Sequence, residues 1–305
     1  MTRLHSAARK AAGSGKEIFP LVISASRATD IPAFHADWFM ERLRQGFCEW
    51  QNPFNANQRQ IVNFSQSRAI VFWSKNPAPL MPYLDEISDS GKKFYFQFTL
   101  NDYECEGLEP RIPPLDERIE TFSRLAERYS VIWRYDPVIA GDTLSIKRHL
   151  RIVENLMKSI GFLTPRLVFS FLDVYGRVGS NLGRFNTEYR APTVEEMRQF
   201  SEELAELRDK IAPQLELASC AETEIDFKSL GIQKNSCIDP FLINKLCNEE
   251  IYPIKNTLFG NSFAKDKGQR NACGCAPSKD IGSYRKHPCG HSCIYCYAGH
   301  ARLKK

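Results

Sequence analysis

The 305-residue sequence lacks any apolar run of the roughly 18 residues that a transmembrane helix needs, so insertion into a membrane is not expected. It also lacks the apolar segment of a secretory signal peptide near its start. Residues 1–16 contain several bases and no acid, a composition that resembles a transit peptide; we interpret residues 1–18 as a flexible N-terminal tail. The sequence contains no solenoid repeat and no low-complexity linker. We therefore expect a folded cytoplasmic protein.

A strong charge imbalance is also missing, since 41 basic and 36 acidic residues give a formal net charge of +5. This mild excess is compatible with an anionic substrate or a nucleic acid, and it requires neither. The chain has ten cysteines, but not the small size and secretion signal that accompany a disulfide framework. We therefore expect reduced thiols in the cytosol, several of them binding metal.

Short runs rich in β-branched and aromatic residues predict strands, and segments with helical periodicity lie between most of them. The strand runs are residues 21–26, 69–74, 94–99, 130–135, 167–171 and 215–220, and helices are expected at 115–129, 146–160 and 193–211. Thr193 and Glu196 form a capping signal at the start of the last helix. The alternation predicts an α/β fold, a (β/α) barrel or partial TIM-type barrel of about six parallel strands over residues 19–250.

Polar residues follow each predicted strand, and the carboxyl ends of parallel strands meet at one face. The candidate catalytic residues there are Arg27, Asp30, Lys75, Arg134, Asp136, Asp173 and Glu222, with Arg177 as a further cation. Arginines suit the recognition of carboxylate or phosphate, and the acids could balance charge or move protons. Two other interpretations remain: polar strand ends occur wherever a strand enters a loop, and any of these residues could be half of a buried ion pair.

The last part of the chain contains Cys289, Cys293 and Cys296 in the spacing C-x3-C-x2-C. Three thiolates can hold three irons of a four-iron, four-sulfur (4Fe–4S) cluster and leave the fourth iron open for S-adenosylmethionine. With aromatic Tyr295 directly before the last cysteine, the pattern matches the motif of radical S-adenosylmethionine enzymes. We expect Tyr295 to pack beside the cluster or the adenine. A zinc site of three cysteines and one histidine, drawn from His287, His291 and His300, is the alternative.

A second group of cysteines precedes this motif. Cys220, Cys237, Cys273 and Cys275 could form a closed site of four thiolates, holding either an auxiliary iron–sulfur cluster or a structural zinc ion. The alternative is that Cys220 and Cys237 are small buried residues. We expect residues 251–305 to form a cysteine-rich segment that packs over the carboxyl face of the strands.

The chain resembles the uncharacterised family known as domain of unknown function 1848 over nearly its whole length. The matching segments are SASRATDIPAF (24–34), NPFN (52–55), FWSKNPAP (72–79), FQFTL (96–100), WRYDP (133–137), SCAE (219–222), CID (237–239), CGC (273–275), DIGSY (280–284) and the cysteine segment up to residue 298. Members of this family end in a cysteine cluster like the one that radical S-adenosylmethionine enzymes carry near their start. The resemblance implies a radical-SAM-like barrel and supplies no known reaction.

These features favour an iron–sulfur enzyme that cleaves S-adenosylmethionine, acts on an unknown anionic or nucleic-acid substrate, and takes electrons from a flavodoxin or ferredoxin. One alternative is a barrel enzyme with a zinc-stabilised C-terminal segment, in which Lys75 forms a Schiff base. Another is a zinc-stabilised nucleic-acid-binding protein that uses the basic C-terminal segment, where lysines and arginines alternate with tyrosines.

Overall fold

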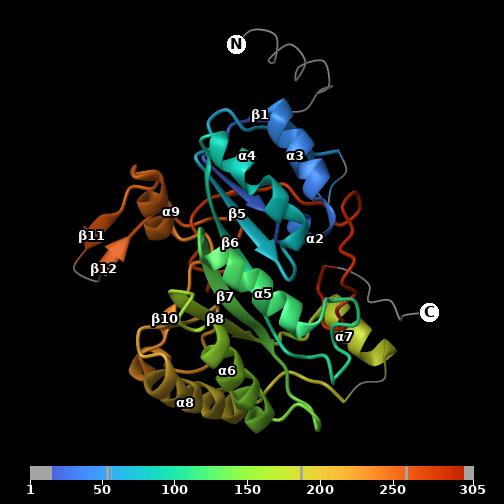
Figure 1. Ribbon diagram of the computed structural model, residues 1–305, viewed down its shortest axis with the longest axis vertical. Helices are drawn as coiled ribbons and strands as arrows, with labels where there is room; N and C mark the ends of the chain where they lie inside the picture. The colour runs from blue at the N-terminus through green and yellow to red at the C-terminus, as the bar shows by residue number, and fades with distance from the viewer. Residues whose placement is uncertain (1–15, 53–54, 56, 186–187, 258–259, 299–305) are drawn as a thin grey trace. The chain divides into compact units, whose positions relative to one another are not determined.

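The computed structural model describes residues 16–52, 55, 57–185, 188–257 and 260–298 (Figure 1). Most of the predicted N-terminal tail, residues 1–15, therefore lies outside the described residues, whereas Lys16–Ile18 form strand β1. The chain divides into two compact units. The first consists of the part up to Tyr95 together with Ile238–Asp266 and Ala276–Cys289, and the second of Phe96–Cys237, Lys267–Cys275 and the part from Gly290 onward. Both units thus recruit segments from the last quarter of the chain.

A large parallel sheet of eight strands confirms the predicted α/β class. The six predicted runs all form strands, namely β2 (Val22–Ala25), β5 (Ala69–Ser74), β6 (Lys93–Thr99), β7 (Ser130–Val138), β8 (Arg166–Phe171) and β9 (Glu216–Ser219). Two short strands, β13 (Lys279–Asp280) and β10 (Gln233–Lys234), stand at the two edges of the sheet. The sheet therefore has more strands than the six expected, because two-residue strands are too short to show a hydrophobic pattern.

The first unit contains the strand order β13-β2-β5, and every residue of β2 is buried. Its remaining elements are α2 (Ile31–Phe34), α3 (Ala36–Gln45), η1 (Ala78–Tyr83), α4 (Leu84–Asp89), α9 (Pro240–Cys247), a small sheet of β1, β4 (Arg59–Asn63) and β3 (Phe47–Gln51), and a hairpin of β11 (Lys255–Thr257) and β12 (Gly260–Ser262). Lys279 of β13 pairs with Ile23 of β2. A residue late in the sequence thus completes a sheet that begins near the start.

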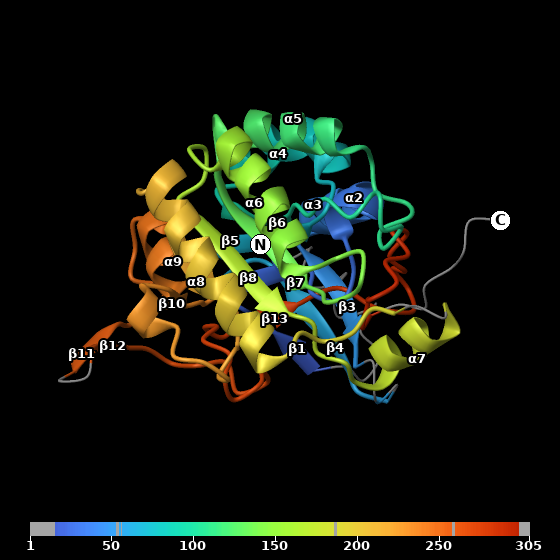
Figure 2. The same cartoon turned by 90° about the horizontal axis from the view of Figure 1, so that it is seen from below.

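The second unit contains the strand order β6-β7-β8-β9-β10, with β6 starting in the first unit and continuing in the second. Its helices are α5 (Leu115–Ala126), α6 (Ile146–Ile160), α7 (Gly176–Arg184) and α8 (Val194–Ile211), with a 3-10 turn η2 at Lys228–Leu230. Helices α6 and α8 lie side by side (Figure 1, Figure 2). Fully buried Phe98, Trp133 and Phe169 form the core of these strands, as expected for a parallel sheet covered by helices.

The three long helices predicted from periodicity are confirmed, and α8 begins with the predicted capping box. Thr193 accepts a hydrogen bond from the backbone N–H of Glu196, and the Glu196 carboxylate accepts one from the backbone N–H of Thr193. In the described part of the chain, no helix is both long enough and apolar enough to span a membrane.

Candidate functional site

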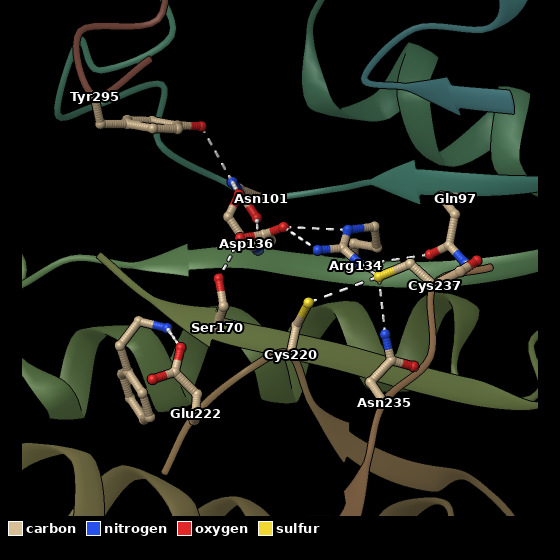
Figure 3. A network of polar contacts seen from close by, with 11 residues as sticks. Gln97, Asn101, Arg134, Asp136, Ser170, Cys220, Glu222, Asn235, Cys237 and Tyr295 are labelled. Carbon is tan, nitrogen blue, oxygen red and sulfur yellow. Dashed lines mark hydrogen bonds and ion pairs between the residues drawn. The ribbon is translucent and has the colours of Figure 1, made fainter. Parts of the chain in front are cut away.

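Asp136, near the end of β7, is the centre of a polar network in the second unit (Figure 3). Its carboxylate accepts hydrogen bonds from the Arg134 guanidinium, with Nε at 3.1 Å, and from the Ser170 hydroxyl of β8. Its backbone N–H donates to Asn101 Oδ1 at 3.0 Å. Parallel strands end at a common edge, so β7, β8 and the segment after β6 bring these groups together.

Arg134 connects this carboxylate to sulfur. Its side chain is buried, and Nη1 donates to Cys237 Sγ at 2.9 Å and to Gln97 Oε1 at 3.4 Å. Burial opposes the charge of the guanidinium, but the negative charges of Cys237 and Asp136 outweigh it and raise the pKa of Arg134. Arg134 is therefore a fixed positive charge held between a carboxylate and a thiol group.

The structure brings together the four cysteines of the second predicted set. The sulfur atoms of Cys220 and Cys237 are 3.6 Å apart, and Asn235 Nδ2 donates to Cys237 Sγ at 2.9 Å. The hydrogen bond from Cys237, assisted by the Arg134 charge, lowers the pKa of Cys220 to about 7.

Cys275 connects Cys273 to the other two cysteines of this set. Hydrogen bonds with Cys220 and Cys275, together with burial, raise the pKa of Cys237. A hydrogen bond with Cys275 and burial likewise raise the pKa of Cys273. The thiols therefore interact in the order Cys220, Cys237, Cys275, Cys273.

Glu222 follows β9 and lies near Cys220, one of these four cysteines. Its Oε1 accepts the backbone N–H of Phe171 at 3.0 Å. Burial, with contributions from the negative charges of Asp173 and Cys220, raises the pKa of Glu222 to about 7. Asp173 itself forms an exposed ion pair with Arg270 at 2.6 Å. Glu222 can thus exchange a proton near neutral pH, next to an exposed charged pair.

Tyr295 of the C-terminal cysteine motif is buried and hydrogen-bonded to the strand ends. Its hydroxyl donates to Glu109, and Asn101 Nδ2 lies 3.4 Å from the same hydroxyl. The backbone N–H of Ile294 donates to Leu108 O at 2.9 Å. The phenol ring therefore holds the motif against the loop that follows β6, and through Asn101 it connects to the Asp136 network.

Helix α7 holds the other side of the motif (Figure 2). Asn181 Nδ2 donates to Cys296 O at 3.2 Å, and Arg177 Nη1 donates to Ala298 O at 2.9 Å. The backbone N–H of Ala298 lies 3.3 Å from Cys296 Sγ. Residues 294–298 are thus bound to two different parts of the second unit, and Arg177 takes part in this attachment.

Cys293 is buried and Cys296 partly exposed, and both belong to the second unit, whereas Cys289 belongs to the first. Among the described residues, no group of three or more His, Cys, Asp or Glu side chains is arranged as a metal site. His287 packs on Trp38, with ring centroids 3.9 Å apart, and burial lowers the pKa of His287 to about 4. His291 is buried, and His300 lies outside the described residues.

Three of the predicted catalytic residues belong to the first unit. Asp30 accepts hydrogen bonds from Ser74 Oγ at 2.7 Å, from the backbone N–H of Lys75 at 2.8 Å and from that of Ala33 at 3.0 Å. The Arg27 guanidinium lies over the Trp73 ring, 5.3 Å from its centroid. Asp30 therefore caps α2 and ties the loop after β2 to the end of β5.

Several residues of the network were not among the predicted site residues. They are Gln97, Asn101, Glu109, Ser170 and Asn235. Gln97 lies within β6, Ser170 within β8 and Asn101 shortly after β6, so their place near the strand ends was visible in the sequence. Glu109 had no such signal, because it becomes relevant only when Tyr295, 186 residues later, reaches it.

The family model described as "Domain of unknown function (DUF1848)" matches residues 22–298 of the chain. The matched range covers nearly all described residues of both units, including the two cysteine groups. No curated protein matches the chain.

Proposed function

The chain belongs to the DUF1848 family, and from this premise we propose that it is an iron–sulfur enzyme of the radical S-adenosylmethionine type. Cys289, Cys293 and Cys296 are the cluster ligands in this proposal. When bound, such a cluster supplies an open iron for the amino and carboxylate groups of S-adenosylmethionine and an electron for cleavage of its sulfonium. The proposed fold is a radical-SAM-like (β/α) partial barrel with the reaction at the carboxyl ends of its strands.

The observation that carries the proposal is the attachment of the motif through Tyr295. Because the phenol is buried and bonded to Glu109, the cysteines on both sides of it are held beside the loop that follows β6. The donor set also fits a cluster: the motif offers three thiol side chains in the spacing C-x3-C-x2-C, and the Ala298 N–H lies within reach of Cys296 Sγ. Backbone N–H groups that donate to a ligand sulfur orient it and stabilise its negative charge.

The polar groups of the second unit have separate tasks in this proposal. Arg134 supplies a fixed positive charge, and Glu222, whose Oε1 accepts the Phe171 N–H at 3.0 Å, takes up or releases a proton. The exposed pair of Arg270 and Asp173 is the contact point for an anionic substrate, either a small molecule or a nucleic acid. A flavodoxin or ferredoxin in the cytoplasm supplies the electron.

The test is anaerobic reconstitution with iron and sulfide, followed by electron paramagnetic resonance of the reduced protein with and without S-adenosylmethionine. We expect a 4Fe–4S signal that changes on addition of the cofactor. Cys293→Ala should remove at least about nine-tenths of the signal, since a cluster left with two cysteines loses a ligand bond.

Cys105→Ala is the matched control, because Cys105 is an exposed free cysteine outside both cysteine groups. It should leave the signal unchanged. A wild-type protein that forms no cluster, or whose spectrum is the same with and without S-adenosylmethionine, would contradict the proposal.

A further inference from the structure

The second cysteine group is assembled from three segments of the second unit. Cys220 follows β9, Cys237 follows β10, and Cys273 and Cys275 lie in the segment Lys267–Cys275. Each of these thiols interacts with another member of the group. Burial of single cysteines does not require such a meeting, so the convergence itself needs a physical explanation.

Gly274 shows that the loop is built to approach the Cys237 segment closely. A Cβ atom at this position would lie 2.7 Å from Ser236 Oγ and 2.8 Å from Asn235 O. Ser236 Oγ donates to Gly274 O at 2.6 Å and holds the two backbones together. A residue with a side chain could not occupy this position without displacing the loop, so glycine between Cys273 and Cys275 allows both thiols to reach Cys237.

Two N–H donors at Cys237 favour a negatively charged sulfur and oppose the thiol hydrogen bonds and the burial that raise the pKa of Cys237. The side chain is buried, and its Sγ receives N–H groups from Arg134 and Asn235, both at 2.9 Å. A neutral thiol is only a weak acceptor, whereas two short N–H contacts are favourable for a thiolate. The Gln97 amide donates to the backbone carbonyl of Cys237 at 2.9 Å and fixes its position. Donors of this kind around a metal site orient the ligand and raise its affinity.

We propose that Cys220, Cys237, Cys273 and Cys275 bind one tetrahedral Zn²⁺ ion, in a structural site separate from the C-terminal motif. A Zn–S bond of about 2.3 Å gives an S–S edge of about 3.8 Å in a tetrahedron. The Cys220–Cys237 separation of 3.6 Å is close to this edge. A four-iron cluster holds its thiolates farther apart, because each binds a different iron.

Zinc explains all four thiols, whereas a Cys220–Cys237 disulfide would leave Cys273 and Cys275 without a role. The four thiols lie within electrostatic reach of one another, but no three of the described side chains are arranged as a metal site, so zinc binding must rearrange them. Binding replaces the thiol protons with the metal and involves no change of oxidation state. The ion would fasten the Lys267–Cys275 segment, which carries Arg270, to the ends of β9 and β10.

The test uses the full chain with Cys289, Cys293 and Cys296 all changed to alanine, so that the C-terminal motif cannot contribute. The protein is loaded anaerobically with Zn²⁺ alone, desalted and analysed by elemental mass spectrometry. We expect about one zinc per chain, as a closed four-thiolate site binds one ion. Adding Cys275→Ala should lower zinc affinity at least about tenfold, whereas adding Cys105→Ala should not change it.

A second measurement follows the four thiols directly, and its alkylation arm needs no further variant. Alkylation followed by peptide mass spectrometry should find the four thiols protected in zinc-loaded protein and modified after a chelator removes the metal. Co²⁺ in place of Zn²⁺ should give the intense visible bands of a tetrahedral thiolate site, and these should disappear in Cys275→Ala.

Three results would overturn the assignment. One is iron and acid-labile sulfide, instead of zinc, bound by these four cysteines in a parallel loading with iron and sulfide. The others are free alkylation of all four thiols at saturating Zn²⁺ and recovery of a Cys220–Cys237 disulfide as the stable form. The triple-alanine variant lacks the three cysteines of the C-terminal motif, so none of these results bears on the proposed radical chemistry. The reconstitution of the wild-type chain tests that chemistry separately.

Discussion

Each unit contains a carboxylate that gathers polar groups at its strand ends, but the partners differ. In the first unit, Asp280 of β13 accepts hydrogen bonds from Ser24 Oγ at 2.9 Å, Ser26 Oγ at 2.7 Å and the backbone N–H groups of Arg27 at 2.7 Å and Gly282 at 2.9 Å. In the second unit, Asp136 pairs with a buried guanidinium that also contacts a cysteine.

The difference indicates a structural role for Asp280 and a chemical role for the network around Asp136. The donors described for Asp280 are hydroxyl and backbone groups, which fasten a loop and do not titrate. Gly282 illustrates this close packing, since a Cβ there would lie 1.9 Å from Ser26 Oγ. Asp136 instead belongs to a network with a fixed cation and thiols. We therefore expect mutations in the first unit to affect folding and those in the second to affect chemistry as well.

Tryptophan reports on the two units separately. The chain has four tryptophans: Trp38, Trp50 and Trp73 lie in the first unit and Trp133 in the second. Fluorotryptophan incorporation and ¹⁹F magnetic resonance in urea can therefore follow the unfolding of each unit in one sample.

The largest expected effect is from Asp136→Ala. This change leaves the buried Arg134 guanidinium without its carboxylate and should lower the free energy of unfolding of the second unit by about 3–5 kcal/mol. The Trp133 resonance in urea gives the measurement. Changing Arg134→Met as well should recover part of the loss, because no unpaired buried charge remains. If the double variant loses as much unfolding free energy as the two single variants together, the unpaired Arg134 charge is not the cause of the loss.

A pH effect of about 3 kcal/mol is expected from His149 of α6. Burial lowers its pKa to about 4 from an ordinary value of 6.5, and its ring contacts Tyr135 Oη and Ile139 O. The unfolded chain therefore takes up this proton at higher pH than the folded chain does. Stability should fall as pH decreases from about 6.5 to about 4, by about 1.4 kcal/mol per pH unit.

His149→Gln, which cannot titrate, is the comparison for this prediction. It should be less stable than wild type at pH 7 and should lose less stability on acidification, as followed by urea unfolding at Trp133. Equal pH slopes for the two proteins would show that His149 does not cause the acid sensitivity.

A smaller effect, about 2 kcal/mol, is expected from Asp280→Ala, because its hydrogen-bond donors are neutral and the carboxylate is only half-buried. The resonances of Trp38, Trp50 and Trp73 should shift to lower urea concentration. Zinc content should stay unchanged. The exposed control Asp89→Ala should alter stability by less than about 0.5 kcal/mol. A loss for Asp280→Ala larger than that for Asp136→Ala would reverse the comparison between the units.

Local pattern was sufficient for much of the fold. The six long strands and the helices α5, α6 and α8 follow from periodicity, and Thr193 with Glu196 formed the predicted capping box. Strands β10 and β13 were missed, because two residues carry no periodicity. The candidate site was recognised only in outline: Arg134, Asp136 and the four cysteines were named, but Asn101 and Glu109, which hold Tyr295, were not.

The sequence by itself determined which segments become strands and helices and which residues carry reactive groups, because both depend on neighbouring residues or on residue type. Only the tertiary structure decided the partners. Arg134 meets Cys237 across 103 residues, and Ser24 meets Asp280 across 256. A buried polar group must find a hydrogen-bond partner wherever the fold brings one near, and that proximity depends on the packing of the whole unit.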